Sequence, residues 1–157
     1  MVPVESESFV RVAVMKVDGT DYQMLPAPVG LHLAPGAWSP MGDQIAYDGW
    51  DDAQPSRTGT YTSEADGSGL VQIIASEDGR HYIPLAYSPH GSRLLVFREG
   101  GYETSLAHVG DLLVVDVGGG NLRQLNRPDI PVATFDITGV KPGQLVSRRR
   151  SGRVRRI

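Results

Sequence analysis

A five-residue pattern that occurs twice constrains the fold of this chain more than its bulk composition does. Residues 38–42 read Trp-Ser-Pro-Met-Gly, and residues 87–91, at an interval of 49, read Tyr-Ser-Pro-His-Gly. Residues 135–139, 48 further on, keep the aromatic residue and the glycine but lose Ser-Pro. The residues that define this element are Trp38, Ser39, Pro40 and Gly42, then Tyr87, Ser88, Pro89 and Gly91, then Phe135 and Gly139.

A second element, a tight turn followed by a short strand-like segment, recurs in step with the first. It reads DGTDYQML at residues 18–25, DGSGLVQI at 66–73 and GGGNLRQL at 118–125. Because two elements recur in register three times, the chain contains an internal repeat of about 50 residues. The Asp-Gly turns of the first two copies are formed by Asp18, Gly19, Asp66 and Gly67.

The local chemistry of each copy predicts four short antiparallel strands. Proline at the second position of Ser-Pro-x-Gly presets φ near −65°, and glycine closes a type I turn between two strands. Beta-prone segments then follow at 44–47, 59–65 and 70–74 in the first copy, and at 93–97, 111–117 and 122–125 in the second. No long stretch keeps a helical period without Gly or Pro. Four strands in a repeat of this length are typical of a β-propeller blade.

We therefore predict an all-β fold, a partial β-propeller with two complete four-stranded antiparallel blades and two half blades. The complete blades span residues 31–75 and 82–126, and the half blades span 9–25 and 131–147. The aromatic residues that precede the Ser-Pro turns, Trp38 and Tyr87, should be largely buried between neighbouring sheets.

The last ten residues, 148–157, differ from the rest in charge and pattern. They contain six Arg and no acidic residue, which leaves nine of the 15 basic residues in the body against all 18 acidic residues. We predict a basic, disordered tail. Because the body is acidic, nucleic acid is not an expected partner.

The two copies, "AWSPMGDQIAY … YTSEADGSGLVQI" and "AYSPHGSRLLVF … DLLVVDVGGGNLRQL", resemble the WD40-like propeller repeat of the TolB family over residues 10–147. This resemblance implies a six-bladed propeller, protein–protein contacts and a periplasmic or extracytoplasmic location. Three features depart from the family pattern: Met41 and His90 replace the usual turn Asp, the third copy lacks Ser-Pro, and the repeats are too few for a ring.

Motifs for catalysis are missing from the sequence. It has no Gly-x-Ser-x-Gly elbow, no His-Glu-x-x-His, no phosphate-binding Gly-x-x-x-x-Gly-Lys and no cysteine. We therefore expect a non-catalytic binding or scaffold module without metal or cofactor. Two alternatives stay open: the propeller portion of a prolyl-oligopeptidase-type serine peptidase that lacks its catalytic domain, and a propeller lyase or lactonase.

Two longer connections, 48–58 and 99–110, fall at equivalent places in the blades and should project on one rim. Loops on a rigid scaffold commonly carry binding residues. The acidic run in the first connection does not fit the ligand spacing of a calcium loop, so we predict no metal site there. The candidate binding residues are Asp48, Trp50, Asp51, Asp52, Tyr102 and His108.

The expected partner is a protein, and the sequence does not indicate its identity. No apolar run reaches the ~20 residues that a membrane helix needs, and the N-terminal segment does not read as a secretory signal. Two copies would supply six blades and could close a homodimeric ring, with residues 131–147 of each copy pairing with residues 9–25 of the other. We favour the competing hypothesis, that the chain is a fragment of a longer propeller.

Overall fold

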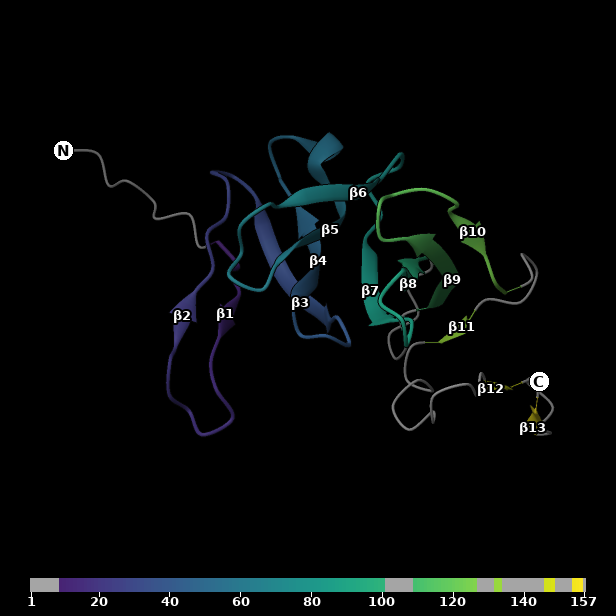
Figure 1. Ribbon diagram of the computed structural model, residues 1–157. Helices are drawn as coiled ribbons and strands as arrows, with labels where there is room; N and C mark the ends of the chain where they lie inside the picture. Colours follow the sequence, from purple (N-terminus) through teal and green to yellow (C-terminus); the bar gives the residue numbers. More distant parts are fainter. Residues whose placement is uncertain (1–8, 101–108, 127–131, 134–145, 149–153, 157) are drawn as a thin grey trace.

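The computed structural model describes residues 9–100, 109–126, 132–133, 146–148 and 154–156. Apart from one short 3-10 helix, η1 (Pro55–Arg57), the regular structure of these residues is entirely β (Figure 1). A two-stranded antiparallel sheet, β1 (Ala13–Val14) and β2 (Gln23–Met24), comes first along the chain. No helix in the described part of the chain is long and apolar enough to cross a membrane.

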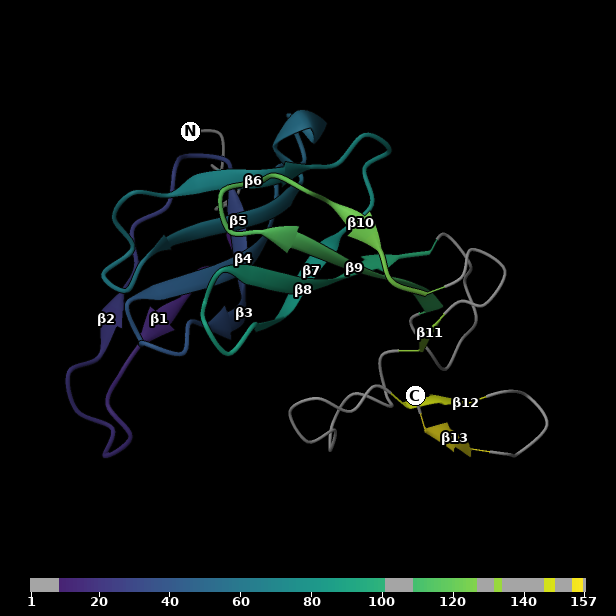
Figure 2. The same ribbon diagram turned by 45° about the vertical axis from the view of Figure 1, so that its right-hand side comes forward.

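Two four-stranded antiparallel sheets follow, each built from strands in consecutive order, as in propeller blades. The predicted all-β, partial-propeller fold class is therefore confirmed. Contacts of β7 with β3, β4 and β5 place the second blade against the first, as the rotated view shows (Figure 2). The first blade comprises β3 (His32–Trp38), β4 (Gln44–Trp50), β5 (Gly59–Glu64) and β6 (Val71–Ala75), and the second β7 (Tyr82–Tyr87), β8 (Arg93–Glu99), β9 (Val109–Asp116) and β10 (Arg123–Gln124).

The C-terminal region contributes three further short strands. β11 (Val132–Ala133) pairs with β9 and so lies on the outer edge of the second blade, beside the β10 pairing. β12 (Val146–Arg148) pairs with β13 (Val154–Arg156), which gives regular structure to part of the segment predicted to be a disordered tail. Most of the half blade predicted at 131–147 lies outside the described residues, as do Phe135 and Gly139. That half blade stays a prediction.

The serine of each Ser-Pro-x-Gly element holds its turn together. The Gly42 amide donates to the Ser39 carbonyl at 3.0 Å, and both Gly42 and its counterpart Gly91 adopt φ of +72°, which favours glycine. The buried Ser39 hydroxyl also accepts the amides of Asp43 and Gln44 at 3.1 and 3.0 Å. Thus the serine satisfies backbone donors at the start of the following strand.

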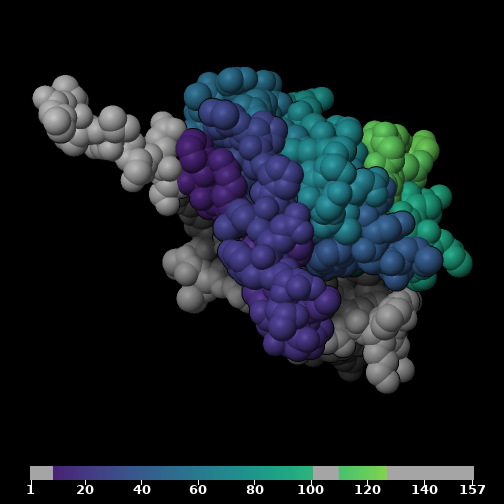
Figure 3. Space-filling view, turned by 60° about the vertical axis from the view of Figure 1, so that its left-hand side comes forward, coloured from purple at the N-terminus to yellow at the C-terminus, as the bar shows by residue number. Residues whose placement is uncertain are grey.

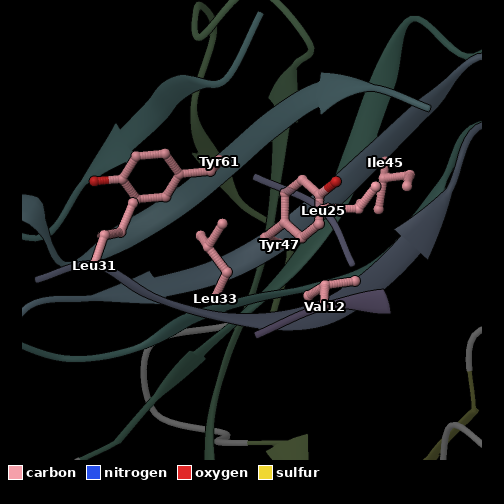
Figure 4. Packing of buried hydrophobic residues seen from close by; sticks show 7 residues of the cluster. All are labelled: Val12, Leu25, Leu31, Leu33, Ile45, Tyr47 and Tyr61. Atoms are coloured by element: carbon pink, nitrogen blue, oxygen red, sulfur yellow. The ribbon is translucent and has the colours of Figure 1, made fainter. Parts of the chain in front are cut away.

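Two apolar cores lie between successive sheets. The first fills the space between β1–β2 and the first blade, and includes Val12 and Leu25, which directly flank β1 and β2, and Tyr47 from β4 (Figure 4). The second lies between the two blades, and includes Ala46 from β4 and Leu94 and Val96 from β8. Because neighbouring residues of a strand point to opposite faces, β4 contributes to both cores.

The prediction that Trp38 is largely buried is wrong. Its exposed fraction is 51%, whereas Tyr87, at the equivalent position, is half-buried and has a fully buried hydroxyl oxygen. The difference follows from the neighbouring sheet. Tyr87 faces β4 of the first blade, but only the short β1–β2 sheet precedes Trp38 among the described residues.

Candidate functional site

The rings of His32, Trp50 and His81 lie in contact at one rim of the two blades. Trp50 ends β4 and lies opposite His32, the first residue of β3, in the β3–β4 register. Their rings are parallel within 7°, with centroids 4.9 Å apart. His81, directly before β7, meets Trp50 edge-on at 5.4 Å, and Phe9 contacts His32 at 5.1 Å. Cross-strand aromatic pairs of this kind stabilise a sheet by up to about 1 kcal/mol.

Two carboxylates pair with the two histidines. His81 Nδ1 lies 2.8 Å from Asp48 Oδ2, and His32 Nε2 lies 3.4 Å from Asp52 Oδ2. The Asp52 side chain is 83% exposed, whereas Asp48 is buried. We call Phe9, His32, Asp48, Trp50, Asp52 and His81 the rim cluster.

Burial dominates the electrostatics of Asp48. Desolvation raises the pKa of its carboxyl above the ordinary value, while the His81 imidazole opposes the shift and the Glu99 carboxylate adds to it. Its second oxygen, Oδ1, is buried without a hydrogen-bond partner among the described residues. Asp48 therefore anchors the partly exposed side chain of His81 at the rim.

His32 is held in one tautomer by the backbone of the N-terminal segment. The Val10 amide donates to His32 Nδ1 at 3.2 Å, so Nδ1 acts as an acceptor and neutral His32 carries its proton on Nε2, facing Asp52. The ring of His32 is therefore fixed on both sides, by Val10 and by the stack with Trp50.

Asp51 shapes the loop after β4. Its side chain is buried, and Oδ1 accepts the amides of Ala53 and Gln54, each at 2.9 Å. Oδ2 pairs with Arg57 at 2.5 Å, and Arg57 also donates to the Val29 carbonyl. These contacts give both oxygens of the buried Asp51 carboxylate a partner within the fold.

Sequence reasoning placed Asp48, Trp50 and Asp51 in an exposed connection, and the structure corrects this. β4 continues to Trp50 because Asp48 and Gly49 pair with both flanking strands. Of the four rim residues expected in this connection, Asp48 and Asp51 are buried. Trp50 and Asp52 do come together at the rim. Tyr102 and His108 lie outside the described residues.

The histidines of the rim cluster were missed because each appeared to be isolated in the sequence. A signal was present, since His32 and His81 are 49 residues apart, the same interval that separates Trp38 from Tyr87. Within the described ranges, no group of three or more His or acidic side chains is arranged to hold a metal ion.

Comparisons with known proteins add little to this description. A scan against protein-family models found no match, and a search of curated proteins found no relative. Among solved structures, the chain is similar to one titled "Crystal structure of Nidogen/Laminin Complex", with 14% identity and a TM-score of 0.49. The alignment covers 78% of this chain and 42% of that chain. The fold class therefore rests on the strand order and sheet packing of the chain itself.

Proposed function

We propose that this chain is a non-catalytic protein-binding module of the propeller type, and that its partner contacts the rim cluster. The observation that carries the proposal is the contact of the His32, Trp50 and His81 rings, which come from equivalent ends of two blades. The exposed carboxylate of Asp52 borders the stack and offers two acceptor oxygens to a partner.

The chemistry of the cluster favours a protein partner. Tryptophan is enriched among residues that dominate binding energy in protein interfaces, because it supplies a large, rigid contact area. The pairs His81–Asp48 and His32–Asp52 hold the rings in place before binding, which lowers the entropy lost on association. The resemblance to the TolB-type repeat, whose members act in protein–protein contacts, supports the same class of function.

The test is affinity capture from an extract of the native host, followed by calorimetry on the identified partner. Trp50→Ala should weaken binding about 30-fold, the effect of losing ~2 kcal/mol at an interface hot spot. Asp52→Ala should weaken it less, because its side chain is mostly exposed.

Val71→Ala is the matched control, since Val71 is 57% exposed on β6, in the outer strand of the first blade. It should leave affinity unchanged. Circular dichroism must show that each variant keeps its fold. A partner that binds Trp50→Ala and wild type equally would contradict the proposal.

A further inference from the structure

The ring of His32 has a different partner at each nitrogen. Nδ1 accepts the Val10 amide at 3.2 Å, and Nε2 lies 3.4 Å from Asp52 Oδ2. A backbone amide can only donate, so the Val10 bond requires a lone pair on Nδ1. Neutral imidazole with its proton on Nε2 satisfies both partners, whereas the imidazolium ion donates from both nitrogens and cannot keep the Val10 bond.

Phe9 is held at the rim through the same hydrogen bond. Its ring lies 5.1 Å from the His32 ring, and the guanidinium carbon of Arg11 lies 4.7 Å from the centroid of the Phe9 ring. The Val10 carbonyl instead accepts the Leu33 amide at 3.1 Å, a bond that does not involve the imidazole. The amide and the carbonyl of Val10 belong to different planar peptide units, so the Phe9–Val10 peptide can turn while the carbonyl stays in place. Figure 3 shows this segment, in dark purple, at the surface beside the first blade.

The His32 ring should keep its position when it gains a proton. It stacks on Trp50, and its side chain is only 13% exposed. A positive charge on the ring makes its contact with Asp52 an ion pair, which strengthens that contact. On the side of Phe9, the same charge faces the Arg11 guanidinium. Attraction on one side and repulsion on the other both favour movement of the Phe9–Val10 peptide over movement of the ring.

Other charged and titratable groups at this rim act less directly on the Val10 bond. Several form ion pairs with one another, and in this set only His32 is bonded to the Val10 amide. On the described elements that meet here, they are Arg11 before β1, Asp51, Asp52 and Arg57 after β4, Glu77, Asp78, Arg80 and His81 before β7, and Asp48 and Glu99 at the ends of β4 and β8.

We propose that His32 is a pH-sensitive switch, in which protonation of Nδ1 breaks the Val10 bond and turns Phe9 away from the rim cluster. Histidine ordinarily changes its charge between about pH 5 and pH 8, so the switch operates in a physiological range. Movement of Phe9 uncovers one side of His32 and leaves a positive charge beside Trp50. One consequence rests on the proposed function: acid pH weakens partner binding, because the rim cluster is no longer held in one arrangement before association.

An NMR titration of the full chain tests the switch without a partner, so a negative result would leave the proposed function standing. At about pH 8, the side-chain nitrogens of His32 should show the proton on Nε2. As the pH falls to about 5, the Val10 amide proton should shift upfield with the midpoint of the His32 ring, and its exchange, corrected for the intrinsic effect of pH, should become about tenfold faster. The Leu33 amide should keep its shift, because its acceptor is the Val10 carbonyl.

His32→Asn removes the titrating group but keeps an acceptor near the position of Nδ1, so its Val10 amide should not respond to pH over this range. His90→Asn is the matched control and should behave as wild type, since His90 is exposed in the turn between β7 and β8, at the other end of β7 from His81. A Val10 amide that keeps its shift while His32 gains a proton overturns the proposal. So does a Val10 transition that persists in His32→Asn, or neutral His32 with its proton on Nδ1.

Discussion

His81 Nδ1 lies 2.8 Å from Asp48 Oδ2, and this contact joins the two blades across 33 residues of sequence. A second polar contact crosses the same seam, where Thr60 Oγ1 donates to the Tyr82 carbonyl. The seam is thus fixed by directional hydrogen bonds as well as by apolar packing, and the two kinds of contact respond differently to substitution and to pH.

Asp48→Asn should change how stability depends on pH. Burial raises the folded-state pKa of Asp48, so the folded protein binds the carboxyl proton more tightly than the unfolded chain. The contribution of Asp48 to stability therefore falls as pH rises from about 3.8, its ordinary value, through the raised pKa. Urea unfolding of wild type and variant across this window should show the wild-type advantage declining, then becoming constant.

Asp111→Asn is the control of opposite sign. Burial raises the pKa of Asp111, but hydrogen bonds from Arg98 and Asn126 outweigh it and the net pKa is lowered. The contribution of Asp111 should therefore be present above 3.8 and be lost as pH falls below that value. If the two variants show slopes of the same sign, the assignment for Asp48 is wrong.

Trp38→Ala should destabilise the chain far less than Tyr47→Ala, although both remove a large aromatic side chain. Tyr47 is 1% exposed in the first core, so its loss should cost about 3–5 kcal/mol. Trp38 is half-exposed, so its loss should cost no more than about 1 kcal/mol. Chemical denaturation measures both. A loss of several kcal/mol for Trp38→Ala would mean that this side chain is covered in solution.

Thr60→Val should weaken the seam without changing the shape of the side chain. The substitution leaves the Tyr82 carbonyl without its buried donor, which should cost about 1–3 kcal/mol. Thr60→Ser keeps the hydroxyl and loses only a methyl group, so it should be the milder variant. The order would be reversed if packing of the methyl group, and not the hydrogen bond, held the seam.

Asp51→Ala should loosen the loop after β4. The variant loses the two bonds to backbone amides and the pair with Arg57, and should cost about 1–3 kcal/mol because the partners are partly buried. Asp51→Asn keeps an acceptor for the amides and should recover part of the loss. Hydrogen exchange of the Ala53 and Gln54 amides reports the effect directly, and unchanged protection in Asp51→Ala would contradict it.

The repeat made the blades predictable from sequence, because strand period, turn residues and the interval of 49 all point to the same strands. Whether an individual side chain is buried depends on the neighbouring sheet, which a repeat does not specify. Trp38 and Tyr87 occupy the same position and differ in burial for that reason. In the same way, Asp48 reads as a loop carboxylate until His81, 33 residues away, is placed beside it.

β4 serves both cores, with Tyr47 on one face and Ala46 on the other. A sheet shared in this way couples each layer energetically to its nearest neighbours, as in other repeat architectures. Unfolding should therefore propagate from the two-stranded β1–β2 layer inward. Loss of β4 would remove the strand that borders both cores. The chain should then no longer unfold as one cooperative unit.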